Sequence, residues 1–117
     1  GGRVVKPLGD GLLVTFTSAE AAVLAGLELV DAQPEPLRLR VGLHTGEVLV
    51  LRYHDVVGHV VNVGARVAES ARGGEVLATE AVTAEIGELP GVQFGRLRRR
   101  ALKGLDEPVR VCAVSRA

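Results

Sequence analysis

Aromatic side chains are scarce in this sequence, at only 3% of 117 residues. Single-stranded nucleic acids stack their bases on aromatic rings, so the chain offers no platform for that kind of binding. The sequence also has no excess of either charge, because 14 basic side chains balance 14 acidic ones and the formal net charge is zero. The chain as a whole therefore does not attract nucleic acid or anionic lipid. An RNA-recognition type of α+β domain fits this composition poorly.

Cysteine and long apolar runs are the other two shortages. The single cysteine, Cys112, excludes an intrachain disulfide and a zinc cluster built on thiolates. It lies in the apolar segment 109–114, which predicts a small core residue and fits a reduced intracellular (cytoplasmic) setting. No apolar run is long enough to span a bilayer, so we expect no direct membrane insertion by this domain. At 47% hydrophobic and 24% charged, residues 1–117 predict one globular domain.

The stretch GRVVKPLGDGLLVTF, residues 2–16, predicts a β-hairpin. Its Gly9-Asp10-Gly11 lies between two β-prone runs, which is a strong short-range hairpin signal. Asp10 is then a carboxylate at a tight turn, with Lys6 on the preceding strand. Such a pair could be a metal site beside an anion- or base-reading group, or an ordinary hairpin with a solvated lysine. Taken alone, the motif favours the ordinary hairpin.

Two kinds of periodicity follow the hairpin. Thr17 and Glu20 form a capping box that predicts a helix start, and Val23, Leu27 and Val30 recur as its buried stripe. Residues 37–43 then alternate between apolar and polar side chains, which predicts a half-buried strand. Short strands are expected at residues 47–51 and 56–57.

Two glycines interrupt the region around that predicted strand. Gly42 and Gly46 indicate a bulge or a close approach of another backbone. His44 lies between them, where the strand breaks. A hydrogen bond to a local partner is the favoured interpretation for this histidine, over contact with a ligand.

Helical periodicity returns at residues 58–71. Val60, Val63 and Val67 share one face, and Asn62 and Arg66 share the opposite one at i and i+4. The helix should therefore bury its valines and present an amide and a guanidinium outward. Alone, this pair would be an ordinary surface pair. We expect residues 72–74, with two glycines, to cap the helix.

The rest of the chain predicts short elements without linkers or repeats. These are a strand at 75–78, a small helix from Thr79 to Ile86 that Thr79 caps, and strands at 92–98 and 109–114. Hairpins with helices between them argue for an α+β domain, an antiparallel or mixed sheet with helices packed on one face. The arginines at positions 96 and 98–100 are expected to form a solvated strand face rather than a nucleic-acid site.

Four segments together resemble one family. VVKPLGDGLLVTF, LRVGLHTGEV, VGHVVNVGARVAESA and LKGLDEPVRVCAV are similar, in this order, to the catalytic domain of class III nucleotidyl cyclases, the adenylate and guanylate cyclases. The likeness extends over essentially the whole chain, and the bacterial adenylate cyclases match best. It implies a ferredoxin-like cyclase fold and conversion of ATP to cyclic AMP and pyrophosphate.

The resemblance also implies roles for particular residues. Asp10 matches one of two metal-binding aspartates, Lys6 the lysine that reads adenine, and Asp55 the acceptor for the adenine amino group. Asn62 and Arg66 match the pair that orients the ribose and stabilises the transition state. Lys103 matches the lysine that binds the terminal phosphates. The Lys6 and Asp55 pair favours ATP, since guanylate cyclases typically carry other residues there.

The implied site needs two ions and two copies of the chain. Two Mg²⁺ or Mn²⁺ ions are expected, and in this family the site forms across a homodimer, so that Asp10 works with the other residues of its neighbour. The aspartate that should provide the second ligand has no counterpart in residues 1–117. Because the chain begins at Gly1, we expect an N-terminally incomplete cyclase domain. Pro7 also lies at a position where members of this family often have threonine. The alternative is a catalytically inactive cyclase-like domain that binds nucleotide or only dimerises.

Overall fold

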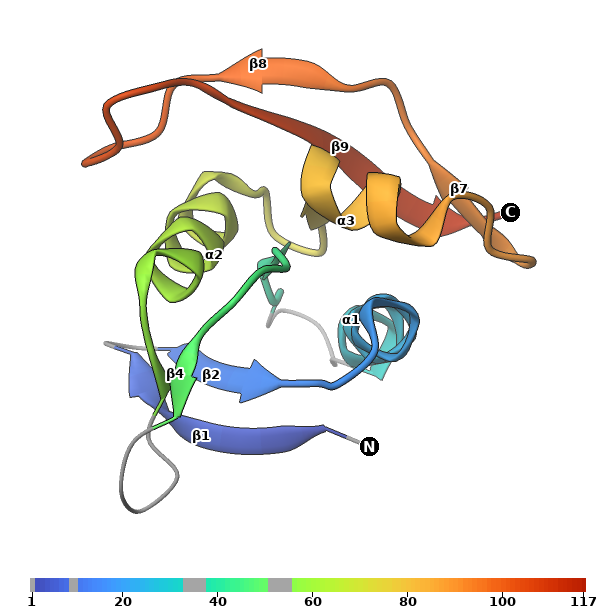
Figure 1. The fold of residues 1–117 in the computed structure, drawn as a ribbon. Coiled ribbons are helices and arrows are strands. Elements are labelled where there is room, and N and C mark those ends of the chain that lie inside the picture. The colour runs from blue at the N-terminus through green and yellow to red at the C-terminus, as the bar shows by residue number, and fades with distance from the viewer. Residues whose placement is uncertain (1, 9–10, 33–37, 51–55) are drawn as a thin grey trace.

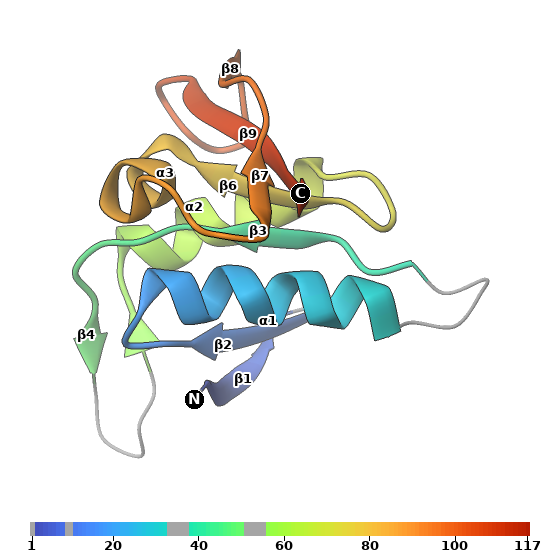
Figure 2. The same ribbon diagram turned by 90° about the vertical axis from the view of Figure 1, so that its right-hand side faces the viewer.

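The computed structural model describes residues 2–8, 11–32, 38–50 and 56–117. Along the chain these residues form β1 (Arg3–Leu8), β2 (Gly11–Thr15), α1 (Ala19–Ala32), β3 (Val41–Leu43), β4 (Leu49–Val50), β5 (Val56–Val57), α2 (His59–Ser70), β6 (Val76–Thr79), α3 (Glu80–Ile86), β7 (Val92–Phe94), β8 (Arg98–Arg100) and β9 (Val109–Arg116). Figures 1 and 2 show their arrangement.

The main sheet is mixed, as the sequence predicted. Its strand order is β3-β6-β9-β7, with β8 also paired to β9. The β3–β6 pairing is parallel, and every pairing with β9 is antiparallel. Strands β4 and β5 form a separate short antiparallel pair. The α+β expectation is confirmed.

The hairpin predicted at the start of the chain is present. Strands β1 and β2 pair antiparallel, with Lys6 opposite Leu13 and Leu8 opposite Gly11. Asp10 itself lies outside the described residues. Within the part of the chain that the structure describes, the hairpin shares no pairing with the main sheet, so Lys6 and the main sheet belong to separate β-structures.

Helix α1 begins one residue later than the capping box predicted. The Ala21 backbone N–H donates to the Ser18 hydroxyl at 3.2 Å, so Ser18 rather than Thr17 caps the helix. The predicted stripe is confirmed, because Val23 and Leu27 are buried and Val30 packs beside them. Threonine and serine can both cap a helix, and the hydrogen bond from Ala21 shows that Ser18 is the cap here.

Strand β3 is shorter than predicted because its neighbour sets its length. Val41 pairs with Val76, where β6 begins, so the residues before Val41 have no strand beside them. The chain there runs along the turn that precedes β6, and Leu39 is 36% exposed. The alternation in the sequence was correct for Val41 and Leu43, which pack against the core.

The predicted close approach at Gly42 is confirmed. A Cβ on Gly42 would lie 2.4 Å from the Ala68 backbone N and 2.7 Å from the Gly64 carbonyl oxygen. Helix α2 therefore packs backbone against backbone on β3.

The C-terminal end of α2 differs from the prediction, because the extended residue Ala71 is the C-cap and the left-handed glycine, Gly74, comes three residues later.

The strand predicted at residues 92–98 is split into β7 and β8. Phe94 lies opposite Val114 and Arg98 opposite Val111, so three residues face two at the break. This extra residue is a bulge, and the Gly95 N–H still donates to the Ala113 carbonyl at 2.8 Å.

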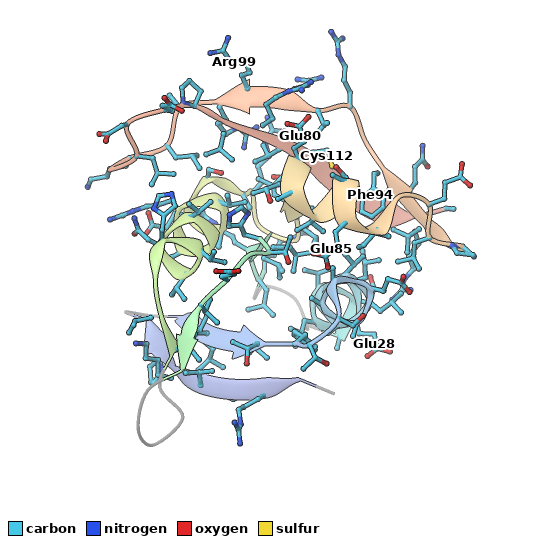
Figure 3. All side chains as sticks on the ribbon, viewed as in Figure 1. Glu28, Glu80, Glu85, Phe94, Arg99 and Cys112 are labelled. Carbon is cyan, nitrogen blue, oxygen red and sulfur yellow. The ribbon has the colours of Figure 1, made fainter. Side chains whose placement is uncertain are left out.

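Strand β8 presents arginines at the edge of the main sheet. Arg98 and Arg99 are exposed, and Figure 3 shows Arg99 pointing away from the molecule. Arg100 is half-buried and donates to the Ser70 carbonyl at 3.2 Å. Charged side chains on an edge strand oppose pairing with another sheet. This agrees with the interpretation of a solvated strand face.

The helices cover both faces of the sheet, whereas the sequence predicted one. Strand β6 is apolar on both sides: Val76 and Ala78 join α1 and α3 in one cluster, and Leu77 joins α2 in the other. Alternate strand residues point to opposite faces, so α2 lies across the sheet from α1 and α3. A four-residue apolar strand does not reveal this from sequence alone.

Cys112 is a core residue on β9, as predicted. It is 2% exposed and belongs to the cluster under α1 and α3. Burial raises the pKa of its thiol, and a hydrogen bond from the Gly95 backbone lowers that pKa by a smaller amount. The thiol is therefore held in its neutral, unreactive form.

Candidate functional site

Helix α2 carries two of the predicted site residues. Val63 and Val67 are buried against the sheet, which fixes the rotation of the helix about its axis. Asn62 is exposed, and the Arg66 side chain is 32% exposed. The valine stripe thus presents Asn62 and Arg66 toward one side of the molecule, one helical turn apart.

The guanidinium of Arg66 has two neighbours, Glu69 and Gly104. Nη1 donates to the two carboxylate oxygens of Glu69, at 3.1 Å and 3.4 Å. The face of the guanidinium lies beside Gly104: a Cβ on that glycine would be 3.6 Å from Nε and from Nη2 and 3.7 Å from Cζ. Nε–H is buried, and among the described residues it has no hydrogen-bond partner.

Lys103 lies on the turn that Arg66 touches. In this turn, named here the lysine turn (residues 102–105), the Leu105 N–H donates to the Leu102 carbonyl at 3.2 Å. Leu102 is buried in the cluster under α2, and Gly104 adopts φ +81°. Lys103 is exposed at the tip. The structure therefore brings the predicted Arg66 and the turn that carries Lys103 together.

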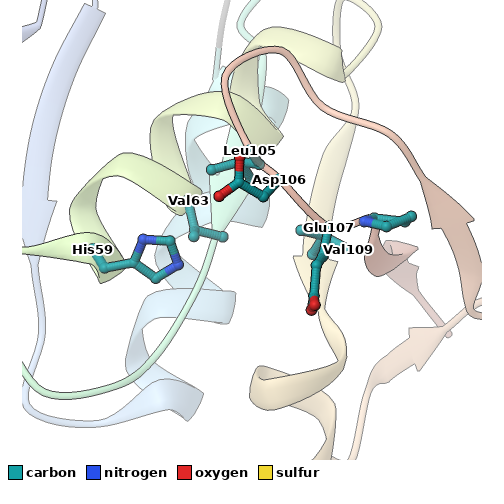
Figure 4. A pocket seen from close by; sticks show the side chains of 7 residues that line it. His59, Val63, Leu105, Asp106, Glu107 and Val109 are labelled. Carbon is teal, nitrogen blue, oxygen red and sulfur yellow. The ribbon is translucent and has the colours of Figure 1, made fainter.

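A groove adjoins the lysine turn. It has a volume of about 380 Å³ and lies between the start of α2 and residues 105–109. Figure 4 shows His59 and Val63 on one side and Asp106 and Glu107 on the other. The groove meets the lysine turn at Leu105, and two carboxylates are part of its lining.

The remaining predicted residues lie elsewhere or outside the described residues. Lys6 is on β1, half-buried, in the hairpin that is separate from the main sheet. Asp10 and Asp55 fall outside the described residues. Among the described residues no group of three or more His, Cys, Asp or Glu side chains could hold a metal ion. The described donors alone therefore do not fit a two-metal site.

His44 has a different partner from the one predicted. Its Nδ1 and the Thr79 Oγ1 are hydrogen-bonded at 2.6 Å, across two neighbouring strands rather than locally. Thr79 is the N-cap residue of α3 by position, but its hydroxyl makes no capping bond there. Thr79 is 1% exposed, so this bond satisfies a buried hydroxyl.

Burial lowers the pKa of His44 below its usual value of 6.5, and the charge of His59 lowers it further. The folded state therefore binds this proton less readily than the unfolded state. The contribution of His44 to the free energy of unfolding is complete above about pH 6.5 and is lost as pH falls through the lowered pKa.

We expect the free energy of unfolding to fall between pH 7.5 and pH 5.5, measured by urea denaturation followed by circular dichroism. His44→Asn keeps a hydrogen-bond partner for Thr79 and should reduce this dependence; an unchanged dependence would contradict the assignment.

Sequence reasoning missed Glu69 and Gly104. Glu69 follows Arg66 at i+3 on a helix, which is a recognisable ion-pair spacing. Gly104 follows Lys103, but nothing in the sequence indicates that it contacts a residue of α2.

Comparison with protein families decides which family the chain represents. The family model of the adenylate and guanylate cyclase catalytic domain matches residues 11–112. The chain belongs to this family. This cyclase domain is also 38% identical, over 112 residues, to an uncharacterized protein of Mycobacterium tuberculosis. The match covers 93% of the domain and 29% of that protein, so the chain spans less than a third of this relative's length.

Solved structures agree with the family. An adenylate/guanylate cyclase/hydrolase from Silicibacter pomeroyi superposes with a TM-score of 0.83 at 28% identity, covering 97% of this chain and 72% of that one. A guanylyl cyclase superposes with a TM-score of 0.79 at 25% identity, covering 99% and 71%. The solved structures that share this fold include a guanylyl cyclase, so the fold alone does not select the base. No helix among the described residues is long and apolar enough to cross a membrane.

Proposed function

We propose that this cyclase domain converts ATP to 3′,5′-cyclic AMP and pyrophosphate. The observation that carries the proposal is the contact between Arg66 and the lysine turn. Two cationic side chains on segments far apart in the sequence are thereby placed in one region. Phosphoryl transfer depends mainly on positioning and on cations that stabilise developing negative charge.

In the proposed reaction the ribose 3′-hydroxyl attacks the α-phosphate and pyrophosphate leaves. Arg66 stabilises the negative charge that develops on the α-phosphate, because a guanidinium binds phosphate oxygens through parallel N–H donors. Lys103 holds the terminal phosphates. Asn62, one turn before Arg66, orients the ribose so that the hydroxyl approaches in line.

Magnesium or manganese is the metal proposed for this domain, with Asp10 as a ligand. Such ions neutralise charge on the phosphates when bound. Asp10 lies outside the described residues, so no part of the scheme above depends on the geometry of a metal site. The resemblance implies a second aspartate as a further ligand.

Base selection is proposed for Lys6 and Asp55. Adenine offers an acceptor at its ring nitrogen and a donor at its amino group, and a lysine with a carboxylate complements that pattern. Guanine presents the opposite pattern at the same edge. A site built to hydrogen-bond one pattern rejects the other, because its own polar groups are then left unpaired.

We also propose that the site is shared in a homodimer. Membership of the cyclase family supports this, since the resemblance places Asp10 with the other site residues of the neighbouring copy. Asp10 of one copy would then act with Arg66 and Lys103 of the other.

The test of ATP specificity is a change in base preference. In the full-length protein with Mn²⁺, wild type should give a higher kcat/KM for ATP than for GTP. The Lys6→Ala, Asp55→Ala double variant should reduce that ratio at least roughly tenfold, because both base contacts are removed. Lys103→Ala is the matched control, since it should weaken ATP and GTP equally.

Three outcomes would contradict parts of the proposal. An unchanged ATP to GTP ratio in the double variant would remove Lys6 and Asp55 from base selection. A wild-type preference for GTP would make the domain a guanylate cyclase. Nucleotide binding without turnover would identify an inactive cyclase-like domain.

A further inference from the structure

Glu69 occupies only one end of the Arg66 guanidinium. Both of its carboxylate oxygens accept from the same nitrogen, Nη1, at 3.1 Å and 3.4 Å. A fork-to-fork pair would instead use two nitrogens. The pairing with Glu69 therefore leaves the other two nitrogens of the guanidinium available.

The guanidinium packs against the lysine turn by its face, next to these two nitrogens. Nε and Nη2 each lie 3.6 Å, and Cζ 3.7 Å, from where a Cβ on Gly104 would be, and Gly104 has none. Nε–H is buried and without a hydrogen-bond partner among the described residues. A buried donor without an acceptor is uncommon and costly in folded proteins, so the Nε–Nη2 edge is suited to receive one.

We propose that Glu69 is a positioning residue: it fixes Nη1 so that the guanidinium of Arg66 lies with its face against the lysine turn and its Nε–Nη2 edge is left for phosphate oxygens. The inference rests on the proposed function, which assigns Arg66 to the α-phosphate. It adds a residue that does not touch the substrate. Without Glu69 only the packing against Gly104 restrains the guanidinium, so its orientation becomes less well defined.

Glu69 affects substrate binding and chemistry in opposite directions. Its negative charge disfavours an anionic nucleotide nearby, whereas its hold on Nη1 favours the transition state. Removing it should therefore lower kcat without raising KM. A partial loss of folding would also lower the apparent kcat at unchanged KM, so kcat has to be expressed per folded protein.

The kinetic test compares Glu69→Ala with two other variants of the full-length protein. With Mn²⁺ and ATP, Glu69→Ala should lower kcat roughly fivefold per folded protein, which is about the ceiling for an exposed ion pair, and KM should stay equal or fall. Glu69→Gln should retain more of kcat, because its amide oxygen still accepts from Nη1. Asp31→Ala is the matched control: Asp31 is 59% exposed and pairs with Arg116 at 2.7 Å, while Glu69 is 60% exposed.

A second measurement does not depend on turnover. Nuclear magnetic resonance can follow exchange of the Arg66 Nε–H with solvent in the protein without nucleotide. Glu69→Ala should accelerate this exchange severalfold, and Asp31→Ala should leave it unchanged. Faster exchange together with an inactive wild type would refute the proposed function while supporting the orientation of Arg66 by Glu69. Unchanged exchange, or an unchanged kcat in an active enzyme, would show that Glu69 is an ordinary surface partner and overturn the inference.

Discussion

Replacing Arg66 by alanine is expected to lower the rate of cyclic AMP formation about 10²- to 10³-fold, the usual effect of removing one preorganised donor to transition-state charge. The loss should fall mainly on kcat. Val63 and Val67, which anchor α2, are untouched by this change. The fold should therefore persist, and circular dichroism should match that of the wild type.

Arg72 provides the control for Arg66. It is an exposed arginine just beyond the end of α2, where its backbone N–H donates to Glu75. Arg72→Ala removes the same charge and side-chain type from a position outside the proposed site, so activity should be retained. If Arg66→Ala were as active as Arg72→Ala, the assignment of the site would be wrong.

Mixing two inactive variants extends this result to the homodimer. Asp10→Ala and Arg66→Ala should each be inactive alone, because each damages both sites of its own dimer. In a mixture, the heterodimers hold one site with neither change, so activity should partly return. Two variants that stay inactive after mixing and re-equilibration would argue for a site contained in one chain.

The second large effect is expected at Gly42. In Gly42→Ala the new Cβ would lie 2.4 Å from the Ala68 backbone N and 2.8 Å from the Ala68 Cα. These neighbours are backbone atoms of a helix, so no side chain can rotate away and α2 must move. We expect a loss of about 3 kcal/mol or more in the free energy of unfolding, measured by urea denaturation. Activity should fall as well, since α2 carries Arg66.

Gly64→Ala is the matched control on the facing helix. A Cβ at Gly64 would meet only the His44 Cβ, at 3.9 Å, which is ordinary contact. Alanine also favours a helix over glycine by about 1 kcal/mol, so this variant should be neutral or more stable. Equal stability of the Gly42 and Gly64 variants would contradict the close packing of α2 on β3.

Local signals in the sequence predicted the elements that depend on local chemistry. The hairpin followed from an Asp-Gly pair between β-prone runs, and α2 from the spacing of its valines. For both features the physical cause lies within a few residues, so a single sequence contains it. Gly42 indicated either a bulge or a close approach, and the choice between them depends on Ala68 of α2.

Features that depend on distant partners were predicted less well. The start of β3 depends on where β6 begins, and the hydrogen bond of His44 depends on Thr79 in the neighbouring strand. For the candidate site, Arg66 and Lys103 were predicted through resemblance to a family, and their proximity could not be derived from spacing. Glu69 was not assigned a role because its carboxylate acts only through the orientation of Arg66.

The buried thiol of Cys112 on β9 allows opening of the sheet to be measured by chemical modification. Cys112 is the only cysteine of the chain, and the chain has no tryptophan to report unfolding by fluorescence. A thiol reagent reaches Cys112 only when β6 and β9 separate or the cluster under α1 and α3 opens, so each modified molecule records one such event. The rate of modification then gives the free energy of that opening in the unaltered protein. Nucleotide or a second copy that binds the closed form would slow this rate in proportion to the stability it adds.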